Sequence, residues 1–276
     1  MRLLRRRENG TFSLTTFINL NNVPRYAILS HTWDANDQEL TYQEIMNNRG
    51  SDKTGFRKIE FCADQAEKDD LNYFWVDSCC IDKSNSVELT EAINSMYRWY
   101  GAAVKCYVYL SDVSVDFQQI SSWDEPFRQS RWFQRGWTLQ ELLAPSSVEF
   151  FSQDEQPLGD KTTLEVQISQ ITGITSQALQ GKPMSEFTVE ERMSWAVDRQ
   201  TTKDEDKVYS LLGIFEVHMP LIYGEGQRNA FRRLREEIDR SLTFNESDEG
   251  ASLTLNNMAI FRTGMFSVNA LTVYLI

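Results

Sequence analysis

A tryptophan and a glutamate near the middle of the chain have the residue types and the spacing to act on one ligand. They are Trp137 and Glu141, within the segment RGWTLQELLAP. On a helix, residues four apart lie one above the other, so the indole and the carboxylate can face the same small volume. Such a carboxylate can oppose positive charge on a bound molecule. The alternative is that Trp137 belongs to the core and Glu141 is a solvated helical charge, as most charged residues are.

A second set of candidate residues lies where short apolar segments end. Ser30, His31 and Trp33 stand at and after the end of the segment YAILS, and Asp77 follows YFWV. These residues are candidates for binding a substrate. His31 either contacts the ligand or holds its loop through hydrogen bonds as a neutral imidazole. Asp77 either orients that loop or caps a turn around Ser78.

Strands and helices alternate along the part of the chain that carries these residues. Apolar segments predict buried strands at 26–30, 73–76, 106–110 and 148–151. Apolar residues with a helical period predict a helix over about 55–68 and a later one capped by Ser84 or Ser86. This alternation predicts an α/β fold, with a parallel sheet covered by helices on both faces. The carboxyl ends of the strands share one edge of such a sheet, and ligands bind there.

The two ends of the chain have other patterns. Residues 1–25 predict edge strands or a cap over the sheet. From about residue 161 the pattern is helical, with two capping boxes, Thr188-x-x-Glu191 and Thr202-x-x-Glu205. The last segment, 245–276, begins polar and ends apolar, and no structure is predicted for it. We therefore expect this tail to add little to stability.

Composition disfavours several classes of partner and site. A net charge of −12 over 276 residues disfavours nucleic acid and anionic lipid as partners. The four cysteines and two histidines have no spacing typical of metal ligands, so no metal site is expected. The adjacent Cys79 and Cys80 favour reduced thiols over a disulfide framework. No apolar segment approaches the ~20 residues of a membrane span, which predicts a cytoplasmic protein.

Four motifs carry a resemblance to a known family. The motif blocks of the fungal heterokaryon-incompatibility (HET) domain resemble, in this order, the segments YAILSHTW, FWVDSCCIDK, RGWTLQELLAP and YGEGQRNAFRRLREEI. The resemblance covers about residues 1–243, with a core at about 20–155, a helical portion at about 160–243 and a tail at 244–276. It implies a role in non-self recognition and in programmed cell death when genetically different fungal cells fuse.

A more distant resemblance is to TIR domains, which have the flavodoxin-like order of strands and helices expected here. Some TIR domains cleave NAD+, and in those a glutamate in the helix after the third strand contacts the ribose. Glu141 stands at that place, so the resemblance implies that it is catalytic. Loss of nicotinamide makes the ribose oxocarbenium-like, and a carboxylate stabilises that charge. NAD+ would be a substrate and not a cofactor, with Trp137 or Trp33 stacked on one of its rings.

Two other functions fit the same residues. The chain could be a non-enzymatic signalling module that acts by TIR-like self-association or through a partner protein. It could also be a Cys-His hydrolase, with Cys79 or Cys80 as the nucleophile and His31 as the base. The first two interpretations differ in whether the carboxylate is needed, because an enzyme requires Glu141 whereas an assembly surface tolerates Glu141→Gln.

Overall fold

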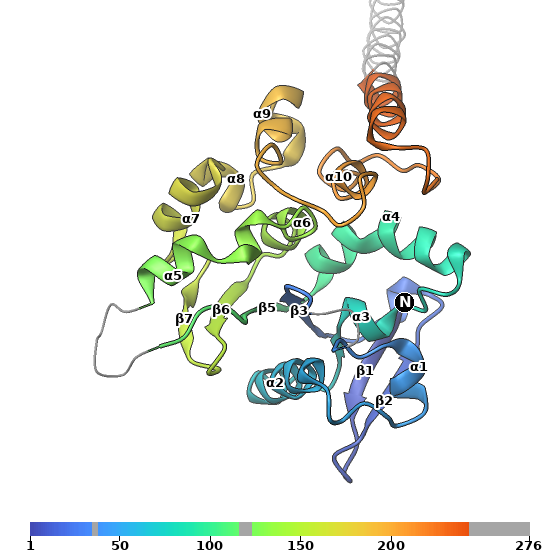
Figure 1. Cartoon of the computed structure of the whole chain (residues 1–276), viewed down its shortest axis with the longest axis vertical. Helices are drawn as coiled ribbons and strands as arrows, with labels where there is room; N and C mark the ends of the chain where they lie inside the picture. Colours follow the sequence, from blue (N-terminus) through green and yellow to red (C-terminus); the bar gives the residue numbers. More distant parts are fainter. Residues whose placement is uncertain (35–37, 116–122, 243–276) are drawn as a thin grey trace, which may run out of the picture.

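A mixed β-sheet with helices on both faces forms the centre of the protein (Figure 1). The structure is a computed structural model that describes residues 1–34, 38–115 and 123–242. Within these residues the sheet has seven strands in the order β2-β1-β4-β3-β5-β6-β7. Their bounds are Arg2–Arg6 (β1), Phe12–Thr16 (β2), Ala27–His31 (β3), Phe74–Trp75 (β4), Lys105–Leu110 (β5), Val148–Ser152 (β6) and Pro157–Asp160 (β7).

The four central strands are parallel, as the sequence predicts. β3 pairs in parallel with β4 and with β5, and β5 pairs in parallel with β6. Numbered along the chain from β3, these strands have the order 2-1-3-4, which is the order in flavodoxin-like sheets. All residues of β3 and β4 are buried, which agrees with their continuous apolar character. The predicted α/β fold is therefore confirmed.

Antiparallel strands extend both edges of this parallel core. β1 and β2 form the hairpin that the pattern of residues 1–25 allowed, and β1 pairs with β4. At the other edge β7 pairs with β6. The sequence did not predict β7, because its residues PLGD include a proline and a glycine that are typical of turns.

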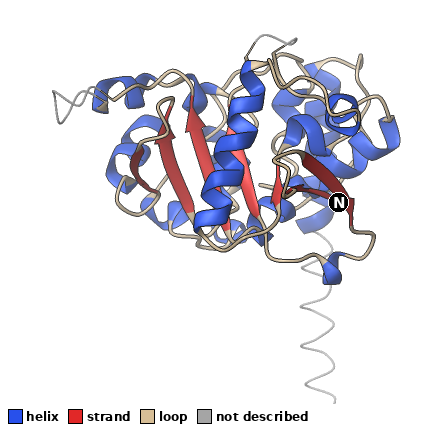
Figure 2. Ribbon diagram, turned by 90° about the horizontal axis from the view of Figure 1, so that it is seen from below, coloured by secondary structure: helices blue, strands red, loops and turns tan. Residues whose placement is uncertain are grey.

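Helices cover the two faces of the sheet (Figures 1 and 2). α2 (Thr54–Lys68) lies on one face, against β3, β4 and β5, and matches the helix predicted over about 55–68. Its buried side chains include Ile59, Cys62 and Ala66, which form one stripe. α4 (Ser86–Ala102) and α6 (Thr138–Leu143) pack against each other on the opposite face.

The N-terminal cap of α4 differs from the prediction. The cap residue is Asn85, whose side-chain oxygen accepts hydrogen bonds from the backbone N–H groups of Val87 and Glu88. Ser84 instead donates to Asp82 in the preceding turn. Asparagine and serine are about equally good N-cap residues, so composition alone could not choose between neighbours.

The chain after β7 is mainly helical. Its helices are α7 (Glu165–Thr172), α8 (Ser176–Leu179), η3 (Met184–Glu186), α9 (Val189–Ser194), α10 (Asp206–Tyr209) and a last helix over residues 227–242. The capping box of Thr188 and Glu191 is present at the start of α9. The one expected at Thr202 is not, because Glu205 accepts the backbone N–H groups of Gly224 and Gly226 instead.

Shorter helices connect the main elements. They are η1 (Leu20–Asn22), α1 (Tyr42–Met46), α3 (Asp77–Cys80), α5 (Asp124–Gln129) and η2 (Arg131–Gln134). Among the described residues, no helix has both the length and the apolar character needed to cross a membrane. The expectation for the tail at 245–276 concerns a segment outside the described residues.

Candidate functional site

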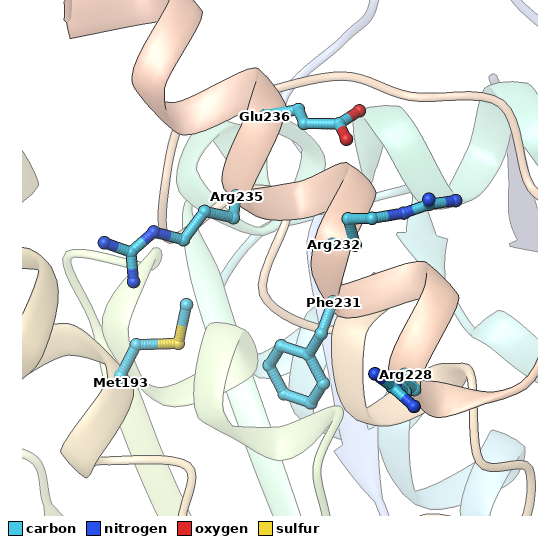
Figure 3. A pocket seen from close by; sticks show the side chains of 6 residues that line it. All are labelled: Met193, Arg228, Phe231, Arg232, Arg235 and Glu236. Carbon is cyan, nitrogen blue, oxygen red and sulfur yellow. The ribbon is translucent and has the colours of Figure 1, made fainter.

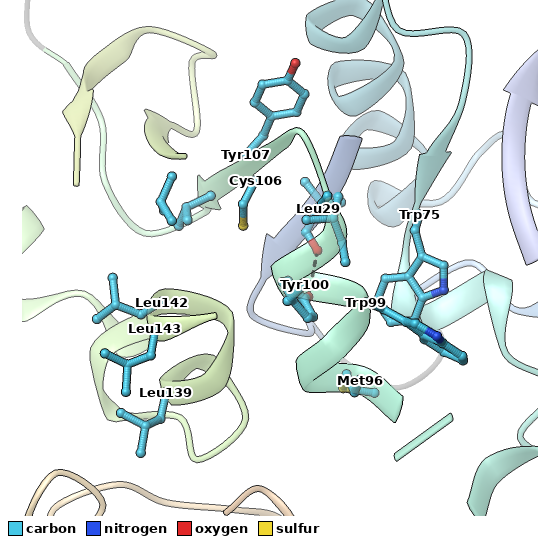
Figure 4. Close-up of a cluster of buried hydrophobic side chains, with 14 of the residues drawn as sticks. Leu29, Trp75, Met96, Trp99, Tyr100, Cys106, Tyr107, Leu139, Leu142 and Leu143 are labelled. Atoms are coloured by element: carbon cyan, nitrogen blue, oxygen red, sulfur yellow. Dashed lines mark hydrogen bonds between the residues drawn. The ribbon is translucent and has the colours of Figure 1, made fainter. Parts of the chain in front are cut away.

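Glu141 lies in a helix that is buried on every side. All six residues of α6 are buried, and its three leucines belong to the hydrophobic cluster shown in Figure 4. In the same cluster the Tyr100 hydroxyl of α4 donates to the backbone oxygen of Leu29 in β3, at 3.0 Å. Glu141 itself is only 7% exposed. It is therefore not the solvated helical charge of the alternative interpretation.

The Glu141 carboxyl group contacts the end of the central strand β3. The Ser30 hydroxyl donates to Glu141 Oε2, and the Trp132 indole N–H donates to Ser30 Oγ at 2.8 Å. All three side chains are buried. Burial raises the pKa of Glu141 to about 7, although the Ser30 hydrogen bond opposes this increase. The structure thus brings together two of the predicted residues, Ser30 and Glu141.

Trp132 reaches this pair because the end of β5 anchors its backbone. Asp112, just after β5, accepts hydrogen bonds from the Ser130 hydroxyl and from the Arg131 N–H, both at 2.8 Å. These bonds hold the start of η2, which carries Trp132. The Trp132 ring also packs edge-on against the ring of Phe150 in β6, with 5.5 Å between the ring centres. Sequence reasoning missed Trp132, although the polar end of β5 and the aromatic segment after it were visible signals.

Trp137 has a different environment from the one expected. It is half-buried at the start of α6, and its side chain lies close enough to Asp206 of α10 to oppose the rise in the pKa of Asp206 that burial causes. The indole that completes the Ser30–Glu141 contact is Trp132. Stacking of Trp137 on a ligand stays a prediction. Asp206, the residue beside Trp137, belongs to the helical C-terminal portion.

A second polar cluster surrounds Asp77, at the start of α3. Asp77 Oδ1 lies 3.2 Å from His31 Nε2, and Asp77 Oδ2 accepts the Trp33 indole N–H at 3.0 Å. The Lys83 ammonium lies 3.6 Å from Asp77 Oδ2 and 3.5 Å from the centre of the Trp33 ring. Burial alone would raise the pKa of Asp77, but Lys83, His31 and Trp33 together hold it well below its usual range. Asp77 is therefore an ionised carboxylate that organises the loop after β3.

A buried ion pair holds the same loop from the α2 side. Lys58 of α2 is 2.6 Å from Glu39 and 2.8 Å from Asp34, and it donates to the Thr32 backbone oxygen at 3.0 Å. His31 Nδ1 lies 3.8 Å from Glu39 and has no hydrogen-bond partner among the described residues. His31 thus holds its loop through Asp77, while its other ring nitrogen makes no hydrogen bond to the part of the chain that the structure describes.

Neighbouring residues of β3 reach opposite faces of the sheet. Ser30 contacts α6 on one face, whereas His31 lies near Glu39 and Lys58 on the α2 side. This follows from the alternation of side chains along a strand. The two polar clusters therefore meet at the carboxyl end of β3, the edge at which the sequence predicted the site.

A buried guanidinium from the C-terminal portion supports the start of α6. Arg199 is 4% exposed, and its Nη1 donates to the Arg135 backbone oxygen at 2.8 Å and to Thr138 Oγ1 at 2.9 Å. Burial lowers the pKa of Arg199 to about 10, and the charge of Glu141 opposes that decrease. Sequence patterns did not single out Arg199, because its role depends on a long-range contact.

The cysteines give no support to a thiol mechanism. All four thiols are free and buried. Cys79 Sγ and Cys80 Sγ face the backbone of Val76. Burial raises the pKa of Cys79 well above its usual range, which disfavours the reactive thiolate.

Comparisons with known proteins identify the family. The family model described as "Heterokaryon incompatibility protein (HET)" matches residues 26–122, which include the loop after β3 and Asp77. The vegetative incompatibility protein HET-E-1 of Podospora anserina is 53% identical over 243 residues, or 87% of this chain. The chain belongs to the HET domain family. The match spans 18% of the length of HET-E-1, and no solved structure matches this HET domain.

Proposed function

We propose that this HET domain triggers programmed cell death on non-self recognition in fungi, and that it does so by hydrolysing NAD+. The family and the 53% identity with a vegetative incompatibility protein support the biological role. One observation carries the proposed chemistry. It is the buried Glu141 carboxyl group, in hydrogen-bond contact with Ser30 at the carboxyl edge of a parallel sheet.

In the proposed reaction the bond between ribose C1 and the nicotinamide nitrogen breaks. Both electrons of the bond go to the nitrogen, so nicotinamide leaves as a neutral molecule and needs no general acid. The ribose becomes oxocarbenium-like, and the Glu141 carboxylate stabilises that charge. Water then adds to C1 and loses a proton, which gives ADP-ribose. With a pKa of about 7, Glu141 is partly ionised at neutral pH, and a cationic nicotinamide ring beside it favours the ionised form.

The more exposed side chains of the Asp77 cluster are suited to the rest of the dinucleotide. The side chain of Lys83 is 34% exposed and that of Asp77 is 24% exposed. A lysine ammonium is a common partner of phosphate, so Lys83 can bind the pyrophosphate. Because Lys83 lies over the Trp33 ring, stacking of a ligand on that face requires the lysine to move towards the phosphates.

The experiment is to incubate the purified chain with NAD+ and to detect nicotinamide by chromatography. Glu141→Gln keeps an oxygen that accepts from Ser30 but removes the charge, so nicotinamide release should be lost while folding is kept. Glu91→Gln is the matched control, since Glu91 is an exposed glutamate of α4. A wild-type chain that releases no nicotinamide, or equal release by folded Glu141→Gln, would refute the catalytic part.

The competing function is signalling by self-association without catalysis. In that case the buried Glu141 is a structural residue, and its substitution changes stability but not signalling. A folded Glu141→Gln variant that still kills cells would favour this function. The melting temperature of the variant, measured in the same preparation, establishes that the protein is folded.

A further inference from the structure

A groove between α9 and the last helix is apolar inside and bordered by arginines (Figure 3). Its volume is about 600 Å³. The groove is lined by Met193, Arg228, Phe231, Arg232, Arg235 and Glu236. None of these residues belongs to the Ser30–Glu141 contact or to the Asp77 cluster. Met193 comes from α9, and the other five come from the helix over 227–242.

The period of the last helix separates a buried face from an arginine face. Ala230, Leu234 and Ile238 are buried, and they recur every four residues. Arg228, Arg232 and Arg235 are exposed. At 3.6 residues per turn these three arginines lie within about 60° of one another around the helix axis. Phe231 is half-buried between the two faces and supplies an apolar wall.

The three arginines of the groove have no partner within the described residues. No hydrogen bond or ion pair of the described chain involves the guanidinium of Arg228, Arg232 or Arg235, and Glu236 is the one carboxylate at the rim. Arg233 of the same helix is instead paired, with Glu225. Like charges at this helical spacing repel one another. These three arginines therefore form a local cluster of positive charge on a chain whose net charge is −12.

We propose that this groove docks an acidic amphipathic segment of a partner protein. The carboxylates of the segment pair with Arg228, Arg232 and Arg235, and an apolar side chain inserts between Phe231 and Met193. Charge complementarity selects an acidic partner, because three arginines and a single glutamate line the groove. The apolar lining favours a peptide over a free phosphate, and a helix laid into an apolar groove is a common mode of peptide recognition.

The test uses the full chain and a labelled helical peptide built from leucine and glutamate, with binding followed by fluorescence anisotropy. The same peptide with lysine in place of glutamate should not bind. Reversal of the three arginines together (Arg228→Glu, Arg232→Glu and Arg235→Glu) should weaken binding of the acidic peptide by about tenfold or more. The neutral triple variant with glutamine should lie between this variant and the wild type.

The matched control reverses three exposed arginines elsewhere, Arg7, Arg25 and Arg49, and so makes the same change in net charge. This control should keep at least half of the wild-type affinity at physiological salt, because distant exposed charges are screened there. Absence of acidic-peptide binding at low salt, or an equal loss in both triple variants, would overturn the proposal. Arginine-dependent binding of phosphatidylserine vesicles without binding of the peptide would also overturn it.

Discussion

At the scale of single residues, Glu141 is an acid whose charged form the fold disfavours. Its pKa rises from an ordinary 4.5 to about 7, so the folded protein binds more protons than the unfolded chain between these values. Its contribution to stability is fully present below pH 4.5 and is lost as the pH rises through about 7. We expect Glu141→Gln to remove this loss, which is on the order of 3 kcal/mol. Urea unfolding at several pH values measures the unfolding free energy of both proteins. A difference in this free energy that does not change with pH would contradict the account.

Asp77 has the opposite dependence on pH. Because Lys83 and His31 hold its pKa below the usual range, Asp77 stabilises the protein above the ordinary aspartate pKa and loses that effect as the pH falls. We expect Asp77→Asn to lower the unfolding free energy by about 1–3 kcal/mol at neutral pH. The difference from wild type should shrink in acid, as measured by urea unfolding across the acid range. A deficit that stays constant down to the acid limit would show that charge is not the cause.

The sequence predicted some of these contacts and missed others for a physical reason. Ser30 and Glu141 could be expected to meet, because parallel topology brings strand ends to one edge. The polar end of β5 and the aromatic segment after it did not fix the position of Trp132, since it depends on the long-range hydrogen bonds that Asp112 accepts from the Ser130 hydroxyl and the Arg131 N–H. Trp137 and Glu141 are four residues apart, as the prediction required. The Trp137 side chain nevertheless lies near Asp206 of the C-terminal portion, and local spacing could not show this contact.

At the scale of elements, segments with a clear apolar or periodic pattern were predictable, including the short strand β4, and short elements without such a pattern were not. The apolar runs located β3, β5 and β6, and the stripe of Ile59, Cys62 and Ala66 located α2. The four-residue elements β7 and α3 carry too few residues for a period. β7 in addition depends on pairing with β6, which a pattern within its own residues does not reveal.

The contact between α4 and the C-terminal portion depends on a glycine. A Cβ added to Gly213 would lie 2.1 Å from Tyr97 Cβ, so a side chain there forces the two segments apart. We expect Gly213→Ala to lower the unfolding free energy by about 1–3 kcal/mol. Gly101→Ala is the matched control, because its Cβ would meet Ala144 O at an ordinary 3.4 Å. Thermal unfolding compares the two, and an equally stable Gly213→Ala variant would refute the close contact.

At the scale of the whole molecule, the helical C-terminal portion is part of the structure that holds the site. Arg199 bonds to the start of α6, and the Gln200 N–H donates to the Gln134 backbone oxygen at 2.6 Å. Asn94 of α4 exchanges hydrogen bonds with the backbone of Met219. Residues 161–242 therefore differ from an appended domain, and changes there can reach Glu141 through α6.

We expect the chain to unfold in a single cooperative transition, because these bonds join the sheet to the C-terminal helices. Removal of 245–276 should leave the thermal midpoint nearly unchanged, since the sequence of that tail has no capping or turn context. Scanning calorimetry of the full and shortened chains measures both expectations. Two separate transitions, or a midpoint lowered by about 5 °C or more, would contradict them.

The central claim is that NAD+ cleavage by Glu141 causes cell death. The most direct measurement follows NAD+ and viability together in fungal cells that express the wild-type chain, Glu141→Gln or Glu91→Gln at equal levels. We predict that NAD+ falls before viability in cells with the wild-type chain or Glu91→Gln, and that both stay normal with Glu141→Gln. Death of cells that express Glu141→Gln, with NAD+ unchanged, would contradict the claim.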